Sequence, residues 1–341
     1  MTAIRFLLAT VWLIGLPASA GAQQQTYLLV VTGLGGDPAY TEQFHTWATT
    51  LIDAAATRYG VPADNITYLG EDPDLDPVTV ADRSTRENVG AAVGEIAARV
   101  APADQIVIVI FGHGSFTDTA RVNLPGRDLS ADDFAELLEP LRGQRVTFIN
   151  TASASGPFVE KLSGTDRTVV TATRTGGERN ASIFGGYFVE AFAEGEDDAD
   201  ANKDRRVSVL EAFTYARLKV KQAYEADGKL LTEHALLDDN GDGEGTAEPD
   251  PLSGDGMIAR TLFLTSGEPT LAEMAFPDDP ELRPLYDDRA SLEERVEALR
   301  VLKDGTDPER YEQELETLLV ALALKSREIR QLEEVRGEAP R

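Results

Sequence analysis

The chain has 341 residues, with 32 lysines and arginines against 59 aspartates and glutamates, and therefore a formal net charge of −27. Hydrophobic residues make up 42 %, which is enough to bury one large core. The acidity argues against nucleic acid as a partner, because binding phosphates requires a basic face, and against a polybasic hold on anionic lipid. The absence of cysteine excludes disulfides, thiolate metal sites and a cysteine nucleophile.

The first 22 residues have the pattern of a secretory signal peptide. Arg5 precedes an apolar stretch at residues 6–16, and the small residues at 18–22 offer sites for signal peptidase. The stretch is shorter than the roughly 20 residues that span a bilayer. We therefore expect residues 1–22 to be cleaved and the mature protein to be periplasmic or secreted, with no stable membrane insertion.

From residue 26 onward, apolar runs of strand length alternate with segments of helical periodicity. The continuous run QIVIVIF at residues 105–111 is typical of a central parallel strand that is covered on both faces. The alternation predicts a three-layer α/β fold, a mostly parallel sheet with helices on both faces. Strands are expected at residues 26–32, 66–69, 105–111, 145–149, 168–172 and 258–264, and helices at 40–59, 85–100, 130–141, 158–162, 183–193 and 207–224.

The composition divides the chain into an α/β domain and a helical tail. The domain is expected over residues 23–268, with an acidic insertion at 194–255. Residues 269–290 are rich in proline and acidic side chains and are predicted to be a linker. Residues 291–341 show helical spacing with a break before Pro308, which predicts a helical hairpin. The hairpin is expected either to dock on the domain or to mediate self-association.

Sheets of this kind place their functional sites at the carboxyl ends of the strands. His113 follows the strand at 105–111 between two glycines and is a candidate general base. The turn TASASG at 151–156 follows the next strand, and its backbone N–H groups can face a ligand or a developing oxyanion. The alternative is a turn that only caps the next helix. Arg174 follows a third strand and is expected to hold a carboxylate of a peptide, or else to pair with Glu178.

Two of these strand ends match a known pattern when they are taken together. One apolar strand ends in His113-Gly114, and a second, about forty residues later, ends in Ala152-Ser153-Ala154-Ser155-Gly156. The pair resembles the His-Gly and Ala-Cys-x-Ser-Gly motifs of caspase-like and legumain-like cysteine peptidases, over roughly residues 26–264. The resemblance implies that His113 is the catalytic imidazole and that Ser153 occupies the position of the nucleophile. It also implies that the N–H groups of Gly114 and Ser153 are the oxyanion donors.

The chain departs from that family at two positions. Ser153 stands where the family has its cysteine, and Thr151 stands where legumains have an acidic residue of the asparagine pocket. An alcohol is harder to ionise than a thiol, and the family's dyad lacks the carboxylate of a Ser-His-Asp triad. We therefore expect a non-catalytic or atypical homologue that binds a peptide or protein segment, with Thr151 and Arg174 in the binding site. The alternatives are a hydrolase with a Ser153–His113 dyad and a scaffold that acts through the helical hairpin.

An acidic stretch has the ligand spacing of an EF-hand-like calcium loop. The oxygen donors of such a loop are expected from Asp200, Asn202, Asp204, the carbonyl of Arg206, Ser208 and Glu211. Arg205 departs from the pattern, which has glycine at that position. A second acidic turn at residues 238–243 lacks the closing glutamate. The spacing predicts Ca²⁺ at residues 200–211 as the cofactor, and a solvated acidic loop is the alternative.

Overall fold

The computed structural model describes residues 24–193, 196–201, 206–250, 254–266 and 308–335, together with single residues between 281 and 299. Its main sheet has seven strands, namely β1 (Thr26–Thr32), β2 (Ile66–Gly70), β3 (Asp82–Arg83), β4 (Gln105–Phe111), β8 (Arg145–Asn150), β9 (Arg167–Thr171) and β10 (Leu236–Asp238).

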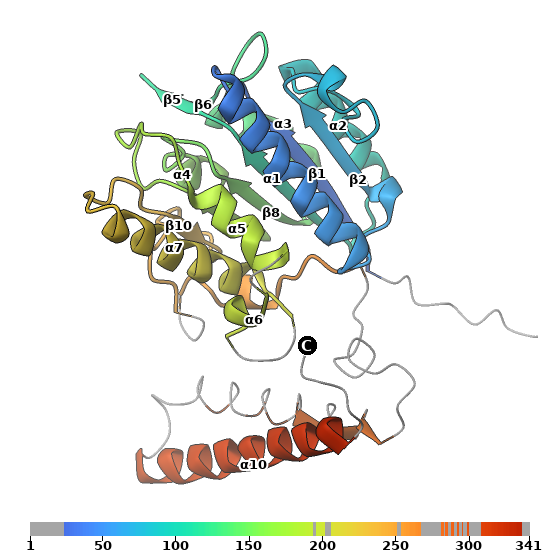
Figure 1. The fold of residues 1–341 in the computed structure, drawn as a ribbon, viewed down its shortest axis with the longest axis vertical. Coiled ribbons are helices and arrows are strands. Elements are labelled where there is room, and N and C mark those ends of the chain that lie inside the picture. Colours follow the sequence, from blue (N-terminus) through green and yellow to red (C-terminus); the bar gives the residue numbers. More distant parts are fainter. Residues whose placement is uncertain are drawn as a thin grey trace, which may run out of the picture.

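The strand order of this sheet is β10-β9-β8-β4-β1-β2-β3 (Figure 1). Every pairing is parallel except that of β10 with β9. The chain runs from β1 to β2 on one side and then returns to β4 on the other side of β1. The switch in strand order therefore lies between β1 and β4, where open α/β sheets bind their ligands.

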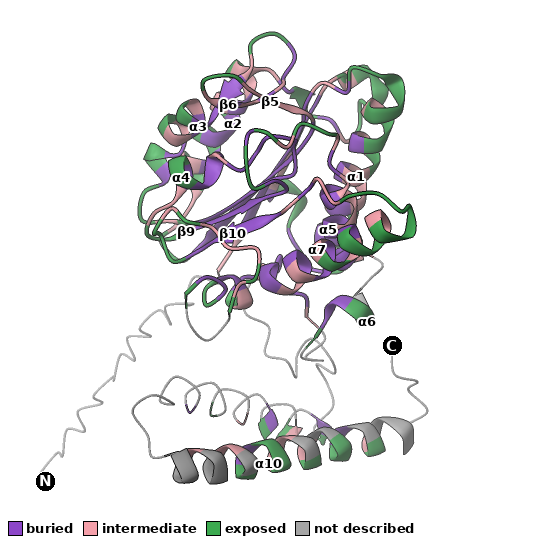
Figure 2. Cartoon of the chain, turned by 90° about the vertical axis from the view of Figure 1, so that its left-hand side faces the viewer, coloured by how far each residue is buried: buried purple, intermediate pink, exposed green. Residues whose placement is uncertain are grey.

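Helices cover both faces of the sheet, so the predicted α/β class is confirmed. Side chains alternate between the faces of a strand, and Val30 and Val109 lie in one core cluster whereas Leu29 and Ile108 lie in the other. The first cluster includes residues of α1 (Pro38–Thr57), α5 (Phe184–Ala193) and α7 (Val209–Ala226). The second includes residues of α2 (Arg86–Arg99), α3 (Ala131–Leu137) and α4 (Phe158–Leu162). Figure 2 shows the strands mostly buried between the two layers.

Local signals explain where several helices begin and end. Asp37 is the N-cap of α1 and accepts a hydrogen bond from the N–H of Ala39, with Pro38 at the first helical position. Ser130 caps α3 in a capping box with Asp133, as its position before the helix predicts. The helix expected at residues 130–141 is interrupted because Pro140 disfavours helical geometry at the residue before it. A 3₁₀ turn, η3 (Glu139–Leu141), takes its place.

Three features differ from the prediction or were not predicted. The strand expected at residues 258–264 is wrong: a 3₁₀ turn, η4 (Ala259–Thr261), lies there. The Asp239 carboxylate accepts hydrogen bonds from the N–H groups of Ile258 and Ala259, at 2.9 and 2.7 Å, and so bends this segment into a turn. The antiparallel edge strand β10 was not predicted. A small antiparallel sheet of β5 (Gly114–Phe116), β6 (Ala120–Val122) and β7 (Leu129–Ser130) was not predicted either.

The described part of the chain has no helix of the length and hydropathy that crossing a membrane requires. Residues 1–22 lie outside the described residues, as do most residues of the predicted linker at 269–290. The signal peptide and the domain boundaries therefore stay predictions. The remaining short elements are η1 (Ala63–Asn65), η2 (Pro73–Leu75) and α6 (Glu196–Ala199).

The tail contains one long helix, α10 (Pro308–Val335), drawn in red outside the helical layers of the sheet in Figure 1. Leu318 of α10 and Leu299 are each 8 % exposed and share an apolar cluster, against which Leu292, Tyr311 and Leu315 pack. Residues on both sides of the predicted break at Pro308 therefore pack together.

The burial of Leu318 yields a prediction with a control on the neighbouring residue. Leu318→Asp should expose the tail to protease, because it places a charge in the apolar cluster. Leu319→Asp adds the same charge at a position that is 41 % exposed and should have little effect. Limited proteolysis followed by mass spectrometry measures the cleavage rate of the tail. Equal rates in the two variants would show that Leu318 is not packed.

Candidate functional site

The central parallel strands end at one edge of the sheet. The register of β1, β4, β8 and β9 brings their last residues side by side. The pairing continues past the strands, since the N–H of Thr151 donates to the carbonyl of Ile110 at 3.0 Å. His113, Ser153 and Arg174 follow the ends of β4, β8 and β9, three strands that are adjacent in the sheet.

The His113 ring is half-buried against the first turns of α1. Tyr40 and Phe44 contact it edge-on, with ring centroids 4.6 and 5.2 Å from that of the imidazole. Burial lowers the pKa of His113, because apolar surroundings disfavour the charged ring, and a hydrogen bond with the backbone of Gly35 opposes this effect more weakly. A bond that raises the pKa is one in which the ring donates, so the Gly35 carbonyl is the acceptor. The lowered pKa favours the neutral ring at pH 7, the form that a general base needs.

The Ser153 hydroxyl lies against the backbone that follows His113. The side chain is 3 % exposed, and its Oγ accepts a hydrogen bond from the N–H of Gly114 at 3.1 Å. The hydroxyl donates to the carbonyl of the same glycine at 3.2 Å. A Cβ on Gly114 would lie 2.2 Å from the Ser153 carbonyl oxygen, so only glycine permits this approach. The two motifs thus meet, but the hydroxyl proton is directed to Gly114 and not to the imidazole.

The turn after Ser153 has an unusual backbone. Ala154 has φ of 56°, in the left-handed region, which costs a non-glycine residue about 1 kcal/mol or more. Its N–H donates to the carbonyl of Glu178 at 2.8 Å, which holds the turn against the loop after β9. Within the described ranges, the N–H of Ser153 has no acceptor. Of the two donors that the family resemblance implies, the one on Gly114 is therefore bound to the Ser153 hydroxyl, and the one on Ser153 is free.

Thr151 and Arg174 differ sharply in their exposure. Thr151 is 2 % exposed, and its hydroxyl donates to the carbonyl of Ile110 at 2.8 Å, so its contact with a ligand stays a prediction. Arg174 is exposed, and its backbone N–H donates to the Glu178 carboxylate at 2.9 Å. Its guanidinium forms no ion pair with the residues that the structure describes. Arg174 and Glu178 are thus linked through the backbone, and the cationic group faces solvent.

Glu178 connects the site loops and was not predicted to do so. Its Oε1 lies 2.7 Å from Nδ1 of His234, and its Oε2 also accepts from the N–H of His234 at 3.2 Å. The carboxylate therefore joins the loop after β9 to the segment before β10. The two residues are 56 positions apart, so no local sequence pattern could indicate the contact.

The predicted calcium ligands are described only in part. Asn202 and Asp204 lie outside the described residues. The Glu211 carboxylate accepts from the N–H and the hydroxyl of Ser208, at 2.9 and 2.8 Å, in the capping box of α7. The Arg206 guanidinium stacks on the ring of Phe263. In the described part of the chain, no three histidine or acidic side chains are grouped as a metal site requires. Calcium at residues 200–211 stays a prediction.

Comparisons with known proteins add one structural similarity. No protein-family model matches the chain, and neither does any curated protein sequence. Among solved structures, caspase-1 from Spodoptera frugiperda is similar with a TM-score of 0.41 and 10 % sequence identity. The match covers 64 % of this chain and 87 % of the caspase chain. The resemblance to legumain-like peptidases and the consequence of Ser153 stay predictions.

The lowered pKa of His113 predicts a pH dependence of stability. In the unfolded chain His113 becomes protonated near its ordinary pKa of about 6.5, whereas in the folded chain it becomes protonated only at a lower pH. The free energy of unfolding should therefore decrease as the pH falls through about 6.5 towards the folded-state pKa. His113→Gln removes this component, so the loss between about pH 7.5 and about pH 5.5 should be smaller in the variant. Urea unfolding measures both proteins, and identical losses would contradict the burial of a neutral imidazole.

Proposed function

We propose that this protein is a peptide-binding homologue of caspase-like peptidases that does not cleave its ligand. The observation that carries the proposal is the hydrogen bonding of Ser153. Its hydroxyl accepts from Gly114 and donates to Gly114, next to a histidine that follows the neighbouring strand. On this proposal, the site keeps the arrangement of a peptidase site around a hydroxyl that is not hydrogen bonded to its base.

Nucleophilic attack by an alcohol requires a base within hydrogen-bond reach, at about 2.6–3.2 Å. The Ser153 proton is instead directed to a carbonyl oxygen, which cannot accept it as a base. The His113 ring is surrounded by Tyr40, Phe44 and the backbone of Gly35. Within the part of the chain that is described, no carboxylate is hydrogen bonded to this ring to stabilise an imidazolium, as the aspartate of a Ser-His-Asp triad does.

Two groups at the strand ends are suited to binding a peptide. Among the described residues, the N–H of Ser153 has no acceptor and the exposed guanidinium of Arg174 has no ion-pair partner, so the first can donate to a peptide carbonyl and the second can bind a carboxylate. The turns that carry them are joined directly, because the N–H of Gly156 donates to the Thr173 hydroxyl at 3.1 Å. A peptide with an acidic side chain or a terminal carboxylate can engage both groups. On a chain with a net charge of −27, such a ligand needs a local cation.

Selection from an unbiased phage-displayed peptide library tests this function. Peptides enriched on the wild-type protein should bind Arg174→Ala about tenfold more weakly, because a charge-assisted hydrogen bond is lost. Arg145→Ala is the matched control, since Arg145 is also exposed but lies at the opposite end of its strand. Equal losses in the two variants, or no enrichment on the wild type, would contradict the proposal.

The same peptides distinguish the scaffold alternative. A scaffold that acts through its tail would capture peptides at the apolar cluster of Leu299 and Leu318. Binding would then be weakened by Leu318→Asp and not by Arg174→Ala. The proposal requires the opposite result.

A further inference from the structure

We infer that Glu71 is a positioning residue for His113, acting through the loop that follows β1. The inference rests on the proposed function only in taking His113 and Ser153 as parts of one site. Glu71 directly follows β2, on the far side of β1 from His113, and lies outside every motif in the sequence.

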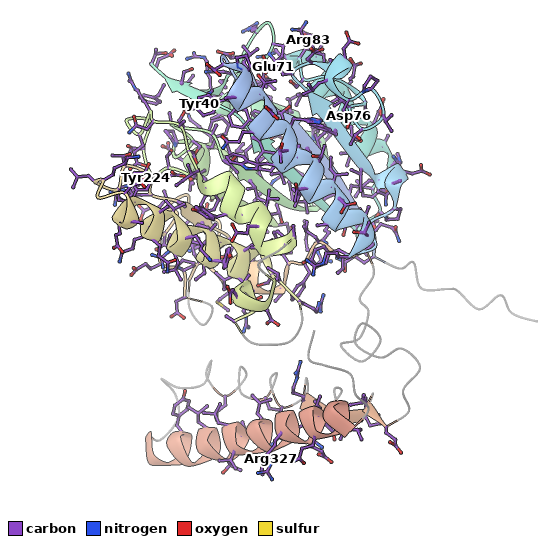
Figure 3. The ribbon with its side chains drawn as sticks, in the orientation of Figure 1. Tyr40, Glu71, Asp76, Arg83, Tyr224 and Arg327 are labelled. Carbon is purple, nitrogen blue, oxygen red and sulfur yellow. The ribbon has the colours of Figure 1, made fainter. Side chains whose placement is uncertain are left out.

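The carboxylate of Glu71 joins two other segments. Its Oε2 accepts a hydrogen bond from the N–H of Gly35 at 3.0 Å and another from the hydroxyl of Thr41 at 2.8 Å. Gly35 lies in the loop after β1, and Thr41 lies in the first turns of α1. Figure 3 shows Glu71 at the end of the sheet where α1 begins, near Tyr40. One oxygen therefore holds the loop and the helix together.

Both joined segments contact the His113 ring. The backbone of Gly35 is its hydrogen-bond partner, and Tyr40 and Phe44 are its aromatic neighbours. The loop after β1 packs closely against α1, since a Cβ on Gly35 would lie 2.5 Å from the backbone nitrogen of Thr41. A shift of this loop relative to α1 would separate the Gly35 backbone, which accepts a hydrogen bond from the His113 ring, from Tyr40 and Phe44, which pack against the ring.

Glu71 is itself held at its backbone. Its N–H donates to the Thr32 hydroxyl at 3.3 Å, and its carbonyl accepts from Nε of Arg83 at 3.1 Å. The carboxylate thus extends from an anchored position at the end of β2. Its contacts with Gly35 and Thr41 require an oxygen acceptor at the end of a side chain of this length, and a glutamine side chain also provides one.

The pKa of a thiol introduced at position 153 reports on the His113 ring. Ser153→Cys gives the chain its sole cysteine, so the ultraviolet absorbance of the thiolate can be titrated without interference from a second thiol. Transfer of the thiol proton to the neutral His113 ring forms a thiolate–imidazolium pair, so the thiol pKa should be lowered by roughly one unit or more relative to Ser153→Cys/His113→Ala. In the Ser153→Cys background, Glu71→Ala should remove most of this lowering, and Glu71→Gln should retain it. Glu42→Ala, at an exposed position of α1, should change nothing.

The outcomes separate the inference from the proposed function. If His113→Ala leaves the thiol pKa unchanged, the two residues do not interact and the proposed site is wrong. If His113 lowers the pKa but Glu71→Ala does not reduce that effect, the site stands and the role of Glu71 is overturned. An equal loss in Glu71→Gln would also overturn it, because the oxygen acceptor would then be irrelevant.

If Glu71→Ala does not fold, Glu71→Asp tests the same point. Its shorter side chain cannot reach both partners and should weaken the effect, and an undiminished effect would refute the inference.

Discussion

Strand β4 is buried along all seven of its residues, and this constraint determines where the candidate site lies. Helices cover both faces of this apolar run, and a parallel strand pairs with it on each edge. Its neighbours β1 and β8 therefore end at the same edge as β4. The loop with Gly35 and the turn with Ser153 both come to lie beside His113 for this reason.

The surroundings that hold His113 also limit its chemistry. Aromatic side chains and a backbone carbonyl orient the ring, and burial lowers the pKa of the imidazole. A neutral imidazole can take a proton from a thiol, whose pKa is about 8.5, far more readily than from an alcohol. The hydrogen bonds of Ser153 with Gly114 add to this difference, since the proton already has an acceptor. The two effects together are the basis of the proposal that this site binds a peptide without cleaving it.

The sequence predicted those features that depend on uninterrupted local patterns. The strands at 26–32 and 105–111 have the predicted bounds because each is a continuous apolar run that ends at a glycine. The contact between Ser153 and Gly114, the residue after His113, agrees with the rule that consecutive parallel strands are commonly neighbours. That rule needs no knowledge of individual contacts.

The features that the sequence did not predict depend on contacts between distant residues. The strand expected at 258–264 has the right composition, but Asp239, about 20 residues earlier, bends the backbone through its carboxylate. Glu71 and Glu178 occupy ordinary loops, and their roles arise from partners 36 and 56 positions away. The direction of the Ser153 hydroxyl is likewise a property of packing, since serine in a small-residue turn has several possible acceptors.

The central proposal is that His113 does not activate Ser153, whose hydroxyl is hydrogen bonded to the backbone of Gly114. Labelling of the wild-type protein with a fluorophosphonate probe tests this most directly, because the probe reacts with serines whose hydroxyl is deprotonated by a neighbouring base. An active serine hydrolase in the same reaction verifies the probe, and peptide mass spectrometry locates any adduct. The account predicts no adduct on Ser153. Rapid labelling of Ser153 that is lost in His113→Ala would contradict it and establish a serine hydrolase.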